Sequence, residues 1–171
     1  MTEELIRAWN EVVQPDDDVY HLGDVSLGRA DKTLVILNRL NGNIHLITGN
    51  HEKSVLDKEY TRNRFVWIKS YYELNVETTE SNFEATSRNK NQSIVLCHYA
   101  FRVWNKSHYQ SIHLYGHSHD NLDKEGVWGK SMDVGVDSAY RILGEYRPFS
   151  LKEVIDIMDK RKVHVIEHHG K

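Results

Sequence analysis

Apolar residues in the first half of the chain alternate between helical spacing and short continuous runs. Side chains that recur every three or four residues predict helices over residues 2–13 and 31–40, and a more polar helix is expected over 52–62. Asp31 is expected to cap the second of these helices. The short apolar runs, which predict strands, cover residues 19–22 and 44–48.

Strand patterns dominate the second half. Residues 65–76 are rich in aromatic and β-branched side chains, and residues 83–86 are the expected hairpin partner. Ser150 and Glu153 form a capping box that opens a helix ending at Met158. No linker or internal repeat interrupts the pattern, so we expect one α/β domain over residues 1–171. The further strands predicted here cover residues 93–97, 112–115, 132–136 and 163–166.

Composition narrows the class of protein. The 171 residues carry a formal net charge of −3, which offers no basic excess for binding nucleic acid. Cys97 is the single cysteine, which excludes an intrachain disulfide and fits a reducing compartment. Neither a signal peptide nor an apolar stretch of roughly 20 residues is present, so a cytoplasmic protein with no membrane partner is expected. The 11 histidines are numerous for this length and direct attention to metal binding.

Four of the predicted strands end in residues that can bind a metal ion. In three of them a glycine comes directly before the polar residue, which lets the backbone turn sharply and approach a bound group. Loops beyond the carboxyl ends of strands are where α/β sheets place their sites. Imidazole and amide ligands together favour Mn, Fe, Zn or Ni over Ca. The four strand endings are Gly23-Asp24, Gly49-Asn50-His51, Cys97-His98 and Gly116-His117-Ser118-His119.

These endings resemble the motifs of the calcineurin-like metallophosphoesterase superfamily, which run D-x-H, G-D, G-N-H-[DE], a lone strand-end His, and G-H-x-H. The chain carries the last four in the same order and is most similar to the small bacterial and phage members. In those members a Trp follows the lone His, as Trp104 does here, and a Val-Gly-Val-Asp stretch precedes a Pro and the final helix, as residues 134–137 and Pro148 do here. The similarity covers nearly the whole chain.

The resemblance implies a fold and a ligand set. The implied fold is a sandwich of two mixed β-sheets flanked by helices, with the site at the strand ends. Asp24 would bridge two divalent ions, with Mn preferred and Fe, Zn or Ni also compatible. The second ion would be completed by Asn50, His98 and His117, and His119 would bind the first. For His98, a hydrogen-bonded core histidine is the alternative interpretation.

The resemblance also implies a reaction. A hydroxide held by the ions attacks phosphorus in line while the ions neutralise the developing charge. His51 and Asp24 are the implied catalytic residues: Asp24 holds the ions, and His51 protonates the leaving oxygen or stabilises the transition state. Glu52 occupies the next motif position and is expected to orient His51. The implied partner is a phosphate ester, preferentially a diester; monoesters, cyclic nucleotides, nucleic acid and phosphoproteins stay open.

The first family motif, D-x-H, is absent, and so is the strand that carries it. The first ion would keep only Asp24 and His119, below the three protein ligands typical of catalytic zinc sites. Three explanations stay open: a chain that starts at an internal methionine of a longer protein, an enzyme with one ion or weakened activity, and a non-catalytic scaffold for protein interactions. A missing interior strand would expose a sheet edge and favour homo-oligomers. Ala100 also departs from the Pro of the small members. His168 and His169 would bind metal non-specifically.

Overall fold

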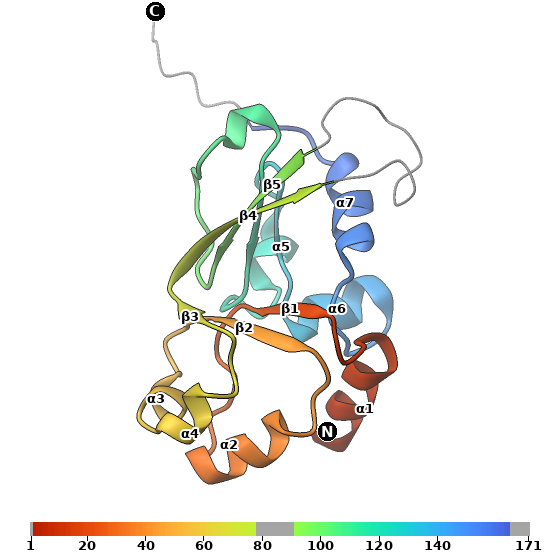
Figure 1. The fold of residues 1–171 in the computed structure, drawn as a ribbon. Coiled ribbons are helices and arrows are strands. Elements are labelled where there is room, and N and C mark those ends of the chain that lie inside the picture. Colours follow the sequence, from red (N-terminus) through yellow and green to blue (C-terminus); the bar gives the residue numbers. More distant parts are fainter. Residues whose placement is uncertain (1, 78–90, 165–171) are drawn as a thin grey trace, which may run out of the picture.

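The computed structural model describes residues 2–77 and 91–164, which form an α/β fold with two sheets (Figure 1). Sheet A has the strand order β1-β2-β3 and is parallel throughout its described part. Sheet B has the order β4-β5-β6-β7; β4 runs antiparallel to β5, and the others are parallel, so this sheet is mixed. The predicted α/β architecture of two sheets with helices is confirmed. The strands are β1 (Asp18–His21), β2 (Asn43–Ile47), β3 (Ile68–Lys69), β4 (Tyr71–Glu77), β5 (Asn91–Cys97), β6 (Ile112–Tyr115) and β7 (Ser131–Asp133).

The helices lie around the two sheets. In Figure 1, α2, α3 and α4 lie beside sheet A at the end of the molecule away from sheet B, and α7 lies alongside sheet B. Among the described residues, every helix is too short or too polar to cross a lipid bilayer. The helices are α1 (Thr2–Val12), α2 (Ala30–Leu37), α3 (Lys53–Leu56), α4 (Glu59–Arg62), α5 (Asn121–Glu125), α6 (Val136–Leu143), α7 (Leu151–Asp159) and the 3₁₀-helix η1 (Ser107–Tyr109).

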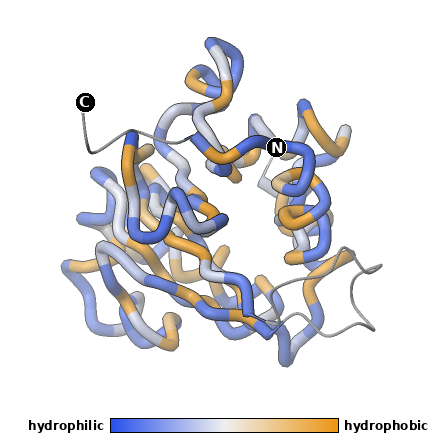
Figure 2. Tube along the Cα trace, turned by 90° about the horizontal axis from the view of Figure 1, so that it is seen from above, coloured by the Kyte–Doolittle hydropathy of each residue, from blue (hydrophilic) through white to orange (hydrophobic). Residues whose placement is uncertain are grey.

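Two hydrophobic clusters hold these layers together. One joins the two sheets to α7 and includes Ile47 of β2, Leu114 of β6 and Met158 of α7. The other packs sheet A against α2 and α3 through Ile44 and Leu37, among others. Strand β2 is therefore covered on both faces, which explains why its sequence is a continuous apolar run rather than an alternating one. In Figure 2 hydrophobic and hydrophilic segments alternate along the described chain, as layered packing requires.

Several predicted elements differ in detail. Asp31 is not the cap of α2: Arg29 holds that position without a side-chain hydrogen bond, and Asp31 lies in the first turn, where its negative charge suits the helix dipole. The polar helix expected over 52–62 is divided into α3 and α4. The strand expected over 132–136 ends at Asp133, and the helix α6 that begins at Val136 was not predicted.

The partner of the strand expected over 65–76 is β5. Tyr71 lies opposite Cys97 and Glu77 lies opposite Asn91 in a continuous antiparallel ladder. The expected hairpin partner, residues 83–86, lies outside the described residues, as do His168 and His169. In the expected last strand, residues 163–164 are not in a strand, and residues 165–166 are outside the described part.

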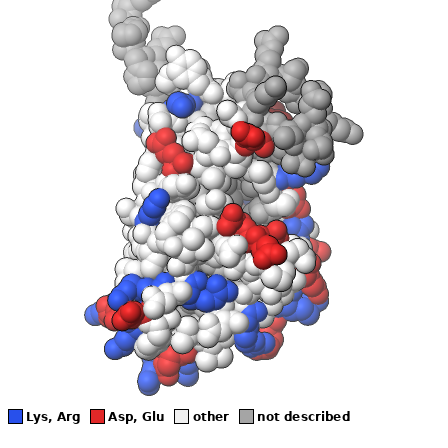
Figure 3. Space-filling view, in the orientation of Figure 1, with Lys and Arg blue, Asp and Glu red and all other residues white. Residues whose placement is uncertain are grey.

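Strand β1 lies at an edge of sheet A. Within the described residues its one strand neighbour is β2, which leaves the backbone groups on its other side unpaired with a strand. Acidic and basic side chains intermix on the face of the molecule shown in Figure 3, so that this face carries no large field of a single sign.

Candidate metal centre

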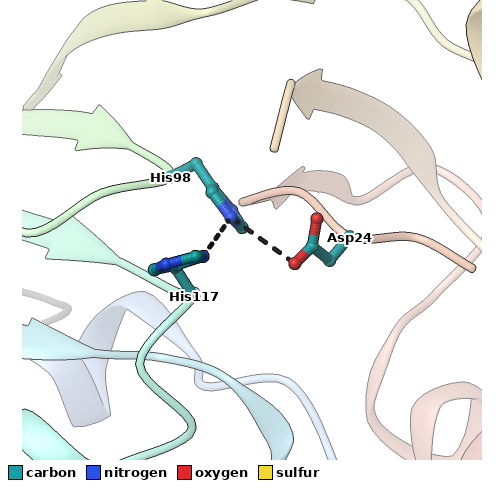
Figure 4. Close-up of side chains that lie close together, drawn as sticks. All are labelled: Asp24, His98 and His117. Carbon is teal, nitrogen blue, oxygen red and sulfur yellow. Dashed lines mark hydrogen bonds and ion pairs between the residues drawn. The ribbon is translucent and has the colours of Figure 1, made fainter. Parts of the chain in front are cut away.

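Three side chains from separate strand ends converge where the two sheets meet (Figure 4). Asp24 follows β1 of sheet A, while His98 and His117 follow β5 and β6 of sheet B. One potential ligand atom of each lies within 4.8 Å of those of the other two. The sequence placed these residues at strand ends, and the structure brings the ends together.

Asn50 adds a fourth potential ligand from the loop after β2. Its Oδ1 lies 3.0 Å from Nε2 of His98. The same nitrogen lies 3.2 Å from Nδ1 of His117 and 3.5 Å from Oδ2 of Asp24. His98 is therefore the centre of the group, and its side chain is 1% exposed.

The hydrogen bond on the other side of the His98 ring explains why these atoms suit a cation. Nδ1 of His98 lies 2.7 Å from the carbonyl oxygen of Leu22, which can only accept, so the ring nitrogen donates. In the neutral ring, Nε2 then carries a lone pair. That lone pair, the amide oxygen of Asn50 and the carboxylate of Asp24 all face the same small volume. Two nitrogen and two oxygen donors in such an arrangement fit a divalent transition metal.

Two glycines allow the loops to approach this closely. A Cβ atom at Gly23 would lie 2.5 Å from Nδ1 of His98, and the residue has φ +96°, a conformation that glycine adopts readily. A Cβ atom at Gly49 would lie 2.5 Å from Oδ1 of Asp24 and 2.6 Å from Cε1 of His98. The glycines that precede Asp24 and Asn50 are therefore required by the packing of the ligands themselves.

The backbone around the ligands is strained. Asp24, His117 and His119 have φ values of 56°, 61° and 48°, in the left-handed region that costs energy for residues with a side chain. In the loop after β6, the fully buried Asp133 offsets part of this cost by accepting hydrogen bonds from Ser118 Oγ at 2.5 Å and Asp120 N–H at 3.0 Å. Sequence reasoning missed Asp133, although a carboxylate within an apolar strand was a signal.

His119 lies apart from the converging group. Its Nδ1 is 2.9 Å from Oδ2 of Asp137, and the two side chains are 74% and 48% exposed. The structure therefore brings Asp24, Asn50, His98 and His117 together, while His119 is paired with Asp137 at the start of α6. No signal in the sequence indicated this pair.

His51 lies beside the group on the solvent side. Its backbone N–H donates to Oδ1 of Asp24 at 3.0 Å, and its side chain is exposed. It lines an open cleft of about 350 Å³. The other residues of that cleft are Ser26, Leu27, Gly28, Lys53 and Asp57. His51 therefore lies between the backbone contact to Asp24 and the open cleft.

Glu52 contacts backbone rather than His51. Its carboxyl group is buried and accepts hydrogen bonds from the N–H of Val25, at 2.8 Å, and the N–H of Gly49. The expectation that Glu52 orients His51 is therefore wrong: both carboxylate oxygens are used between the two loops.

Two further aromatic groups border the site. Burial lowers the pKa of His21 to about 4, which keeps its ring neutral, and Nδ1 accepts the N–H of Gly23 at 3.3 Å. Tyr99 is 46% exposed and stands edge-on to the rings of His98 and His117, at centroid distances of 4.9 and 4.8 Å. Tyr99 thus forms part of the wall of the site, whereas the buried Trp104 packs on His113 in the interior.

Comparisons with known proteins give a relative and a fold but no activity. No protein-family model matches the chain. Over 169 residues the chain is 30% identical to the uncharacterized protein MJ1445 of Methanocaldococcus jannaschii, an alignment that covers 95% of this chain and 78% of that protein. The crystal structure of AQ665, a protein of unknown function from Aquifex aeolicus, is similar in fold with a TM-score of 0.60. That match is 22% identical and covers 91% of this chain and 84% of the other.

Proposed function

We propose that this chain, which belongs to the same family as the uncharacterized protein MJ1445, is a metal-dependent phosphoesterase with phosphodiesters as its first candidate substrates. The observation that carries the proposal is the convergence of Asp24, Asn50, His98 and His117 beside His51 and an open cleft. These are the residues that match the metallophosphoesterase motifs, in the same order along the chain.

The four converging side chains would hold the ion. Asp24 offers an anionic oxygen, Asn50 a neutral oxygen, and His98 and His117 offer ring nitrogens, a set that favours Mn, Fe, Zn or Ni. A bound divalent ion neutralises charge on phosphoryl oxygens and makes hydroxide available at neutral pH. In the conformation described, the ligands gather around one position. A second ion, at the position of the first family metal, would use Nε2 of His119, because Nδ1 of this ring is paired with Asp137.

His51 would act on the leaving group. Its imidazole is exposed and lines the cleft next to Asp24, so it is accessible to a bound ester. A histidine side chain there can give a proton to the oxygen that leaves phosphorus. Lys53 lines the same cleft and supplies positive charge toward an anionic ester.

The test is hydrolysis of aryl phosphodiesters by the manganese-loaded protein. We expect turnover that a chelator abolishes and that His51→Ala reduces on the order of 100-fold while manganese binding is retained. The loss should be larger for a phenyl than for a p-nitrophenyl leaving group, because the poorer leaving group depends more on protonation. His108→Ala, which changes a histidine in η1, is the matched control and should keep wild-type turnover.

The alternative from another class is a non-catalytic interaction module. It is supported by the unpaired edge of β1 within the described residues. A wild-type protein that binds manganese but hydrolyses neither monoesters nor diesters would favour this module and contradict the phosphoesterase.

A further inference from the structure

We propose that Glu52 is a positioning residue that sets the spacing between the loops carrying Asp24 and Asn50, and thereby the affinity for the metal ion. This inference rests on the proposed metal site. It concerns a residue outside the ligand set and assigns to it a different role from that of His51.

The evidence begins with what the two oxygens of Glu52 contact. The residue is 2% exposed. Oε1 accepts the N–H of Val25 at 2.8 Å, and Val25 directly follows Asp24. Oε2 accepts the N–H of Gly49, which directly precedes Asn50. One buried carboxyl group therefore joins the backbone next to two ligands, with one oxygen on each loop.

Sheet hydrogen bonding does not hold these loops together. Strands β1 and β2 are paired from Asp18 with Asn43 to His21 with Leu46, and their ladder ends there. Beyond it, the loop of Asp24 is linked to the loop of Asn50 by Glu52 and by the bond from His51 N–H to Oδ1 of Asp24 at 3.0 Å. The hydrogen bonds of Glu52 thus connect the two chain segments beyond the end of the β1–β2 ladder, in the loops that carry Asp24 and Asn50.

The conformation of Asp24 makes this connection necessary. Its φ of 56° is unfavourable for a residue with a side chain, so surrounding bonds must hold it. The bond from Val25 N–H to Glu52 fixes the peptide directly after Asp24. With Oδ1 of Asp24 bonded to His51 N–H, Oδ2 is left directed at His98, 3.5 Å away. Without Glu52, the Asp24 loop loses the contact that holds this geometry.

The chemistry of the side chain explains why a glutamate is needed. A carboxylate presents acceptors on both ends, whereas glutamine has one acceptor and one NH₂ group. In Glu52→Gln the NH₂ group would face either Val25 N–H or Gly49 N–H, which leaves a buried donor without an acceptor. The substitution preserves shape and leaves all four ligands intact.

The experiment compares manganese binding by calorimetry in the wild type, Glu52→Gln and Glu153→Gln. Glu153 is the matched control because its carboxyl also accepts a backbone N–H, that of Ser150, in the cap of α7. Each protein is measured well below its own unfolding temperature. We expect Glu52→Gln to bind manganese at least tenfold more weakly, about 1.4 kcal/mol, and Glu153→Gln to bind as the wild type does. If Glu52 had a merely structural role, both substitutions would lower the unfolding temperature, and both variants would keep the wild-type affinity for manganese.

Amide hydrogen exchange of the metal-free wild type keeps the inference testable if Glu52→Gln does not fold. The N–H groups of Val25 and Gly49 should exchange slowly, and rapid exchange at either position would overturn the proposal. Equal manganese affinity in Glu52→Gln and the wild type, or no manganese binding by the wild type, would also overturn it. If the wild type binds manganese, Glu52→Gln binds it more weakly, and the loaded wild type hydrolyses no ester, then the inference on Glu52 stands and only the phosphoesterase proposal fails.

Discussion

At the scale of single residues, the site depends on how closely backbone can approach His98. The ring donates to the carbonyl of Leu22, and two glycines lie where any side chain would collide with it or with Asp24. The sequence shows a glycine before the polar residue at three strand ends, but it does not distinguish them. The structure does: a Cβ at Gly49 would be 2.5 Å from its nearest neighbour, and one at Gly116 would be 3.4 Å from the carbonyl oxygen of Leu22.

Gly49→Ala is therefore expected to damage the metal site, and Gly116→Ala is its matched control. The added methyl group at position 49 must displace the Asp24 carboxylate or the His98 ring, so manganese binding should weaken at least tenfold. At position 116 the methyl group has nearly ordinary contacts, and binding should change less than threefold. Calorimetric titration of both variants checks this, and equal affinities would contradict the steric argument.

At the scale of elements, the local signals that succeeded were those whose partners lie within a few residues. The capping box of α7 is present as predicted: Ser150 Oγ accepts the N–H of Glu153, and the Glu153 carboxyl accepts the N–H of Ser150. Helix α6 was missed because its first residue, Val136, follows Val134 at the alternate spacing of a strand. Its start is set by distant contacts, such as Ser138 with the buried Asp120 at 2.6 Å.

The α7 cap predicts a dependence of stability on pH. The hydrogen bond from Arg147 and the bonds from Ser150 lower the pKa of Glu153 to about 2. Because the folded-state pKa lies below the unfolded value of about 4.3, this contribution is present above that pH and is lost as pH falls toward about 2. We expect Glu153→Gln to cost about 1 kcal/mol of unfolding free energy at pH 7 and little at pH 2. Urea unfolding at both pH values measures this, and an equal cost at both would contradict the assignment.

At the scale of the whole molecule, the candidate ligands join the two sheets. Asp24 and Asn50 come from sheet A, and His98 and His117 come from sheet B, so an ion bound by all four is a cross-link that exists only in the folded state. Ligands that bind only the folded state stabilise it by mass action.

Bound manganese is therefore expected to raise the free energy of unfolding of the protein. At a free concentration 100 times its Kd, the gain should be about 2.7 kcal/mol, visible as a higher unfolding temperature. His117→Ala should lose most of this gain, whereas His108→Ala in η1 should keep it. Calcium should stabilise less because it prefers all-oxygen ligands. Equal stabilisation of His117→Ala and the wild type would show that the ion binds elsewhere.

The sequence alone determined the elements and the chemistry available at their ends. Apolar periodicity is a local property, so it predicted helices and strands, and the polar residues after four strands identified Asp24, Asn50, His98 and His117 as candidates. Tertiary structure decided which of these meet. It placed His119 with Asp137, directed the Glu52 carboxyl to the backbone of Val25 and Gly49, and buried Asp133 beneath the loop that follows β6. Those contacts depend on distances between segments far apart in the chain, which only the packing of the two sheets sets.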